Sequence, residues 1–98
     1  MTSKQRAYLR SMANTLKCTL YIGQDGIDAQ TISEAYSILE ARELMKVQVR
    51  AENITAREAC DKLCEALGCE PVQVIGNRFV VYREAREKKR YAEILSSL

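Results

Sequence analysis

The chain has 98 residues, of which 47% are apolar and 29% charged, and its formal net charge at pH 7 is +2. This length is enough for one small domain, and the balance of apolar and charged residues favours a packed core over disorder. No apolar run approaches the roughly 20 residues that a membrane span needs. The N-terminus also lacks the apolar segment of a signal peptide, so no membrane association and a cytoplasmic location are expected.

Charge is distributed unevenly along the chain. Residues 1–17 contain four basic residues and no acid, residues 18–41 contain four acids and no base, and residues 42–50 carry a surplus of two positive charges. A local basic patch on a weakly charged protein suits a structured polyanion better than indiscriminate coating of DNA. An ordinary solvated surface is the alternative interpretation.

Four cysteines and no histidine limit the possible metal and redox chemistry. The spacing of Cys18, Cys60, Cys64 and Cys69 fits neither a CxxC redox pair nor paired zinc knuckles. Without a secretion signal the thiols are expected to be reduced, and Cys60 and Cys64 are interpreted as small core residues of a helix. No metal and no other cofactor is predicted.

The first predicted helix spans residues 3–16. Thr2 and Gln5 have the spacing of a capping box. Arg6 and Arg10 lie one turn apart and form a basic edge, which Lys17 joins if the helix reaches it; this edge either faces solvent or contacts phosphates. The helical spacing of apolar residues predicts one buried stripe, formed by Leu9, Met12, Ala13 and Leu16.

The next stretch predicts a strand, a tight turn and the start of a helix. Leu20 and Ile22 alternate with polar neighbours, as in a half-buried strand. Gly23 and Gly26 allow a sharp turn between them, and Asp28 is a good N-cap for the following helix. A GxxG loop also leaves the backbone bare, so that the sugar-phosphate chain of RNA can approach closely. A purely structural turn is the alternative interpretation.

The remaining pattern predicts helices over residues 29–41 and 56–67 and strands over residues 44–50, 72–75 and 79–82. Thr55 and Glu58 form a second capping box, and Gly68 ends the helix that they begin. Strands separated by helices should be parallel, and the final hairpin should be antiparallel. The fold class predicted is therefore α/β, as a single domain with a mixed four-stranded sheet.

One face of this sheet is predicted to be polar. Thr19, Tyr21, Lys46, Gln48 and Arg50 should lie opposite the main apolar row. A single aromatic residue falls short of the stacked aromatics that an RRM sheet uses, so no base is expected to be read on this face. The loop end of the sheet is the better candidate for RNA contact.

Residues 84–98 are charged and then mildly apolar, and they are predicted to form a helical extension. This extension either packs on the domain or projects towards a protein partner. Sequence alone leaves both possibilities open.

Four segments together resemble one family. They are residues 3–14 (SKQRAYLRSMAN), 21–27 (YIGQDGI), 38–49 (ILEARELMKVQV) and 72–83 (VQVIGNRFVVYR). The combination is similar to a YhbY-type CRM domain (chloroplast RNA splicing and ribosome maturation) over residues 2–83, followed by the extension of residues 84–98. The resemblance implies a fold like that of the C-terminal domain of translation initiation factor three. It also implies a non-catalytic protein that binds large-subunit rRNA or the pre-ribosomal particle, assists ribosome assembly and acts as a monomer.

The resemblance also implies which residues contact RNA. The gripping loop corresponds to Gly23, Gln24, Asp25 and Gly26, and the basic positions around the second strand correspond to Arg42 and Lys46. Loops of the family generally carry a lysine after the first glycine, where this chain has Gln24. Asp25 repels phosphate, so the positive charge must come from elsewhere, and the candidates are Arg6, Arg10, Lys46 and Arg78.

A protein-interaction adaptor and an enzyme are the alternatives to RNA binding. A protein-interaction adaptor could dock through the apolar residues of the extension or through the sheet face. An enzyme is disfavoured, because the chain has no histidine, no Walker-type phosphate loop and no nucleophile elbow.

Overall fold

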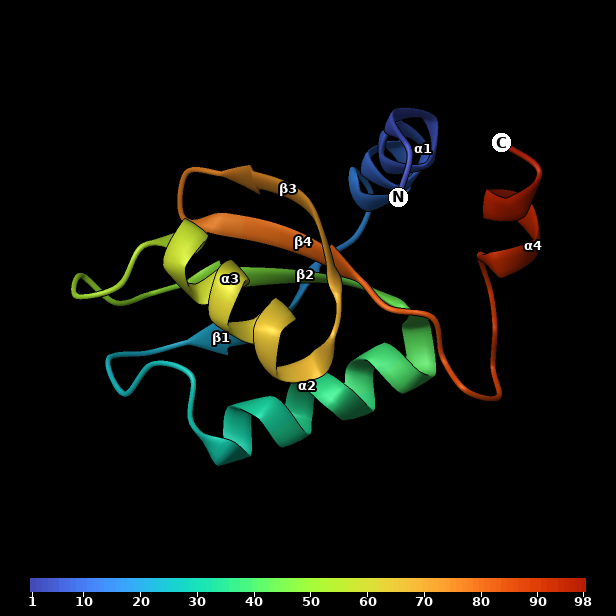
Figure 1. Ribbon diagram of the computed structural model, residues 1–98. Coiled ribbons are helices and arrows are strands. Elements are labelled where there is room, and N and C mark those ends of the chain that lie inside the picture. Colours follow the sequence, from blue (N-terminus) through green and yellow to red (C-terminus); the bar gives the residue numbers. More distant parts are fainter.

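The computed structural model describes residues 1–98 and contains one mixed sheet with helices on both of its faces (Figure 1). The helices are α1 (Ser3–Ala13), α2 (Ala29–Arg42), α3 (Ala56–Leu67) and α4 (Ala92–Ser96). The strands are β1 (Cys18–Ile22), β2 (Leu44–Val49), β3 (Glu70–Ile75) and β4 (Arg78–Tyr82). Their order in the sheet is β1-β2-β4-β3, with β1 parallel to β2 and β4 antiparallel to both of its neighbours. The predicted α/β fold with a mixed four-stranded sheet is confirmed.

Local side-chain bonds fix the starts of the helices where the sequence predicts them. Thr2 and Gln5 form a reciprocal capping box at α1, and Thr55 and Glu58 form another at α3. Gly68 ends α3 in the left-handed conformation, with a φ of 67°. These contacts satisfy backbone groups that a helix end leaves without partners.

The first helix is shorter than the predicted residues 3–16, because α1 ends at Ala13. The chain tightens there: Leu16 donates its N–H to the carbonyl of Ala13, and the Thr15 hydroxyl donates to the carbonyl of Met12. Such local side-chain bonds compete with continued helix. As a result Lys17 lies outside the helix. Met12, expected in the buried stripe, lies within the helix but is exposed, and only Leu9 and Ala13 of that stripe are fully buried.

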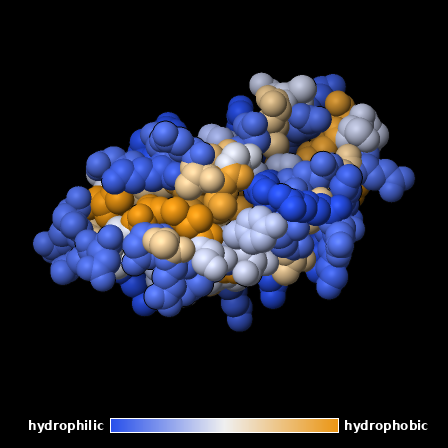
Figure 2. Space-filling view, turned by 60° about the horizontal axis from the view of Figure 1, so that its bottom comes forward, coloured by the Kyte–Doolittle hydropathy of each residue, from blue (hydrophilic) through white to orange (hydrophobic).

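Two apolar cores lie on opposite faces of the sheet. The larger core packs α2 and α3 against alternate strand residues such as Ile22, Val47 and Phe79, and it includes fully buried Cys60. The expected polar face of β1 and β2 therefore lies on the other side of the sheet, the α1 side. Figure 2 shows an apolar strip between polar side chains on the surface that carries α2 and α3.

The smaller core covers only part of the α1 side. Leu9 of α1 and Leu95 of α4 pack there on Leu44, Val80 and Tyr82. In Figure 1, α1 and α4 lie over one end of the sheet, and the loops after β1, β2 and β3 emerge at the other end. The half of this face nearest those loops is left uncovered.

The C-terminal segment packs on the domain. Its helix, α4, has five residues and is much shorter than the predicted span of residues 84–98. The Tyr91 ring meets those of Tyr8 and Tyr82 edge-on, with centroids 6.5 and 6.3 Å apart. Gln5 of α1 donates its side-chain amide to the carbonyl of Leu95 at 2.9 Å. Of the two possibilities for the extension, packing is the one observed.

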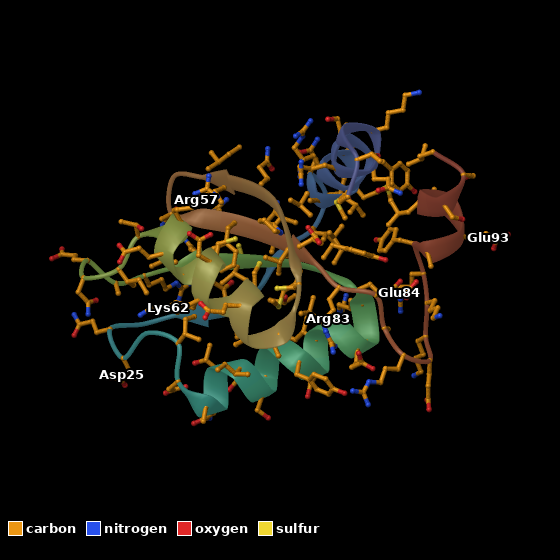
Figure 3. The ribbon with its side chains drawn as sticks, viewed as in Figure 1. Asp25, Arg57, Lys62, Arg83, Glu84 and Glu93 are labelled. Atoms are coloured by element: carbon orange, nitrogen blue, oxygen red, sulfur yellow. The ribbon has the colours of Figure 1, made fainter.

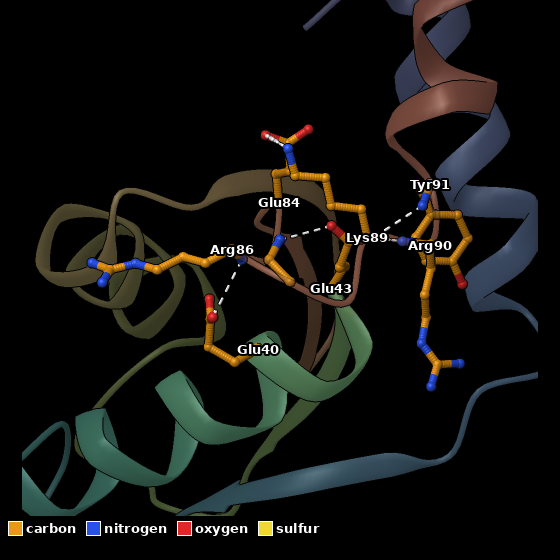
Figure 4. A network of polar contacts seen from close by, with 8 residues as sticks. Glu40, Glu43, Glu84, Arg86, Lys89, Arg90 and Tyr91 are labelled. Atoms are coloured by element: carbon orange, nitrogen blue, oxygen red, sulfur yellow. Dashed lines mark hydrogen bonds and ion pairs between the residues drawn. The ribbon is translucent and has the colours of Figure 1, made fainter.

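A buried acid that sequence reasoning counted only as a charge holds this segment in place (Figure 4). Glu43 is fully buried at the C-cap of α2 and has a φ of 66°. Its carboxylate accepts hydrogen bonds from the backbone N–H groups of Ala85 at 2.7 Å and Tyr91 at 2.9 Å, and also from that of Arg90. The returning segment is therefore fixed to the corner between α2 and β2.

None of the four helices has the length and apolar character required for a membrane span.

Candidate nucleic-acid interface

The glycine loop, residues 23–26, is a tight turn at the carboxyl end of β1. The Gly26 N–H donates to the Gly23 carbonyl at 3.0 Å, and the φ of Gly26 is 72°, where residues with a Cβ are strained. Gly23 has no such φ, and a Cβ built there would meet nothing within 4 Å. Neither packing nor backbone conformation within the protein requires a glycine at position 23. Its effect is to keep the surface of the turn open to another molecule.

Two amides of the glycine loop are available to an anion. The N–H groups of Gln24 and Asp25 donate to no acceptor in the protein. The carbonyl of Gln24 accepts a hydrogen bond from the side chain of Asn53 at 3.2 Å, which fixes the turn to the loop after β2. Asp25 lies at the outer tip of the loop (Figure 3). The turn thus offers backbone donors beside one carboxylate, as the sequence indicates.

The N-terminus of α2, next to the loop, is already capped. Asp28 accepts hydrogen bonds from the backbone N–H and the hydroxyl of Thr31, both at 2.8 Å, which confirms it as the N-cap. The backbone hydrogen bond from Thr31, followed by that from its hydroxyl, lowers the pKa of the Asp28 carboxyl. Phosphate contact in this region must therefore rely on the turn amides and not on the helix N-terminus.

The loops at this end of the sheet are tied to one another. Val49 donates its N–H to the carbonyl of Asn77 at 2.7 Å, and the Asn77 side chain donates to the carbonyl of Val49 at 3.3 Å. Arg50 donates its N–H to the carbonyl of Ile22 at 2.8 Å. These bonds give the glycine loop a rigid support.

The basic hollow is a second feature of the interface. Arg42 and Lys46, both predicted from sequence, line it together with Lys17. It has a volume of about 490 Å³, and no acidic residue lines it; the other lining residues are Thr15, Leu16, Cys18, Thr19 and Leu44. The hollow lies at the start of β1, and the glycine loop lies at its end. A strand of five residues separates the two by about 16 Å.

Lys46 connects the basic hollow with the middle of the sheet. It also lines a second hollow, of about 210 Å³, together with Arg78, Asn14 and Gln73. Positive side chains therefore continue from Lys17 through Lys46 to Arg78 on the α1 side.

Arg6 and Arg10 lie apart from this group. Arg6 donates its Nε to the carbonyl of Pro71 at 3.3 Å and lines a hollow at the edge strand β3, with Arg57. Three strand spacings, about 14 Å, separate β3 from β1. Arg10 is exposed in the last turn of α1. The structure thus places the basic edge of α1 away from the glycine loop.

Sequence reasoning did not identify a contact between Tyr21 and Arg50. The guanidinium carbon of Arg50 lies 3.9 Å from the centroid of the Tyr21 ring. Alternation places both residues on one face, but the contact depends on the pairing of β1 with β2, which sequence does not specify.

Three of the four cysteines lie away from this interface, and the fourth, Cys18, lines the basic hollow. Cys60 and Cys69 are buried in the larger core, and the sulfurs of Cys64 and Cys69 are 3.2 Å apart. A hydrogen bond with Cys64 lowers the pKa of the Cys69 thiol. All four thiols are free, and Cys60 is confirmed as a core residue.

Residues 1–83 match the family model of the CRS1 / YhbY (CRM) domain. The chain belongs to the CRS1/YhbY (CRM) family. A Bacillus subtilis (strain 168) relative of this CRM domain, "Probable RNA-binding protein YqeI", is 34% identical over 91 residues, which cover 92% of this chain and 95% of the relative. An "RNA-binding protein" of Haemophilus influenzae is 28% identical over 90 residues, or 91% of each chain. The solution structure of SAV1595 from Staphylococcus aureus has a TM-score of 0.76 at 42% identity and covers 91% of this chain and 94% of that one.

Proposed function

We propose that this CRM domain binds RNA without catalysing a reaction, through the glycine loop and the cations on the α1 side of the sheet. The observation that carries the proposal is the basic hollow, where three cations gather without an acid in the lining. The names of the relatives support it. A polyanion neutralises such a cluster and releases its own counterions, which is the main source of affinity in nucleic-acid binding.

The proposed contacts are mainly to the RNA backbone. The free amides of Gln24 and Asp25 can donate to phosphate or sugar oxygens, and the lysines and arginines supply charge. Backbone contacts position a nucleic acid but carry little sequence information. Recognition should therefore favour RNA shape over base sequence.

We extend the proposal to the cellular target. Family resemblance supports large-subunit rRNA within the pre-ribosomal particle, bound by a monomer in the cytoplasm during ribosome assembly. Cross-linking of the protein in cells, followed by sequencing of the attached RNA, tests this target. Cross-links spread over messenger RNA would contradict it.

Salt dependence tests the proposed interface in vitro. Binding to a structured large-subunit rRNA fragment should weaken steeply as salt increases. Arg42→Gln and Lys46→Gln should each weaken binding and lower the slope of log affinity against log salt by roughly one. Lys62→Gln is the matched control, because Lys62 is exposed on α3, on the other face (Figure 3). Tight binding that is independent of salt would contradict the proposal.

An adaptor role is the second candidate, and two exposed apolar side chains favour it. Ile94 is 41% exposed and Leu98 is 47% exposed. Deleting residues 84–98 would be a poor test, because it would also remove buried Leu95 and uncover the smaller core. Ile94→Ser combined with Leu98→Ser is the better variant. Unchanged RNA binding with loss of a co-purifying protein would favour the adaptor.

A further inference from the structure

The Arg50 guanidinium stacks over the Tyr21 ring on the uncovered half of the α1 side, next to the glycine loop. We propose that this stack is a platform for one unpaired base of a single-stranded RNA segment. This inference rests on the proposed function, in which the glycine loop and the basic hollow bind the RNA backbone. It adds a separate site for a base.

Strand register places the stack at the end of an exposed row. Tyr21 pairs with Gln48, Gln48 with Arg78, and Arg78 with Ile75. Directly paired residues lie on the same face, so these four side chains cross the whole sheet, over about 14 Å. Tyr21 is 47% exposed and Ile75 is 64% exposed. No helix covers this row.

The stack has a geometry suited to a flat ligand. The Arg50 guanidinium is planar, is exposed, and lies 3.9 Å from the ring centroid. The Tyr21 hydroxyl is within 3.4 Å of the carbonyl of Cys18, which helps to hold the ring against its own strand. An exposed cation–π contact contributes little to protein stability. Its more distinctive property is that a planar cation lies over an aromatic ring and both are exposed to solvent.

Charge identifies the occupant as a nucleotide. Arg50 gives the platform itself a positive charge, Lys46 and Arg78 lie on the same face of the next two strands, and the row contains no acid. A ligand that combines a planar ring with negative charge matches both features, and RNA bases stack on aromatic side chains and on guanidinium planes. Only Ile22 separates Tyr21 from the glycine loop. A strand whose backbone is bound at the loop can therefore place a neighbouring base on the stack.

Sequence alone predicts no base on this face, because it shows a single aromatic residue. The guanidinium supplies the second plane, and only the folded structure reveals it. One stacked base also requires no sequence preference, because every base has a π-face.

The test uses a single-stranded oligoadenylate that carries the fluorescent base 2-aminopurine. Tyr21→Leu should weaken binding about tenfold and abolish the quenching of 2-aminopurine fluorescence, without changing the salt slope. Tyr21→Phe should bind like the wild type, because it keeps the ring. Arg50→Lys should keep the salt slope but bind more weakly, because a lysine has no plane to stack.

Tyr36→Leu is the matched control, because Tyr36 on α2 also has an arginine over its ring: the guanidinium carbon of Arg83, which follows β4, lies 5.1 Å from the ring centroid. Urea unfolding midpoints establish that each variant is folded. If Tyr21→Leu and Tyr36→Leu bind the oligonucleotide equally well, the platform is wrong and the proposed function stands. If the wild type shows no salt-dependent binding to any RNA, the platform and the proposed function are both wrong.

Discussion

At the scale of single residues, Glu43 stands out because it is the one charged side chain that is buried. Glu43→Ala would leave the amides of Ala85, Arg90 and Tyr91 without their acceptor, and we expect it to lower the free energy of unfolding by about 3 kcal/mol. Glu43→Gln keeps the shape and one acceptor oxygen, so its cost should be about half of that. Urea unfolding measures both. Equal stability of Glu43→Ala and the wild type would show that the hydrogen bonds do not hold the segment.

The two glycines of the loop should respond differently to substitution. Gly26→Ala places a Cβ at a φ of 72° and should cost about 1 kcal/mol of stability. Gly23→Ala should be close to neutral, because its Cβ meets open space. Gly23→Glu should also fold, yet it should bind RNA more weakly, because it adds a side chain and a negative charge beside the turn amides. Wild-type RNA affinity in folded Gly23→Glu would exclude the turn from the interface.

At the scale of elements, α4 depends on tertiary packing. A helix of five residues is far too short to be stable alone. Leu95→Ala removes its buried side chain from the smaller core, and we expect α4 to lose its amide-exchange protection while β2 keeps its own. Ile94→Ala is the matched control on the exposed side of the same helix. Protection of α4 in Leu95→Ala equal to that in Ile94→Ala would contradict this dependence.

Elements with strong local signals could be predicted from sequence. The capping boxes at Thr2 and Thr55, the N-cap at Asp28 and the alternation in β2 are all short-range features, and the structure shows each of them. The predicted end of α1, at residue 16, lies beyond the observed end at Ala13, because the bond from Thr15 to the carbonyl of Met12 is a weak local signal. The length of α4 is set by distant partners, so periodicity overestimated it.

The candidate site was less predictable than the elements. The glycine loop could be located because its glycines are adjacent in sequence to a strand and an N-cap. The meeting of Lys17, Arg42 and Lys46 depends on where three elements end in space. Likewise, the sequence does not distinguish Arg6 from the other candidate cations. In the structure Arg6 contacts β3, the edge strand farthest from β1 and the glycine loop. Which cations meet depends on how strands distant in sequence pair, and this pairing cannot be inferred from a single sequence.

At the scale of the whole molecule, the proposed interface has two separate parts. The glycine loop and the basic hollow lie at opposite ends of β1, about 16 Å apart, and no residue of the loop lines the hollow. Losses of RNA affinity in Gly23→Glu and Arg42→Gln should therefore add within about 0.5 kcal/mol in the double variant. Titration of one structured rRNA fragment with all four proteins measures this sum. A double variant no weaker than the worse single variant would mean that the two parts contact RNA as one unit.

The buried bond between Glu43 and residues 90 and 91 also affects the order in which the molecule is completed during its synthesis. The carboxylate at the α2–β2 corner has neither of these two backbone partners until residues 90 and 91 have left the ribosome. Until then a nascent chain must keep a charged group near its interior, or leave that corner unfolded and hydrated. The sheet can assemble early, but the domain reaches its final, closed form only after residue 91 has emerged.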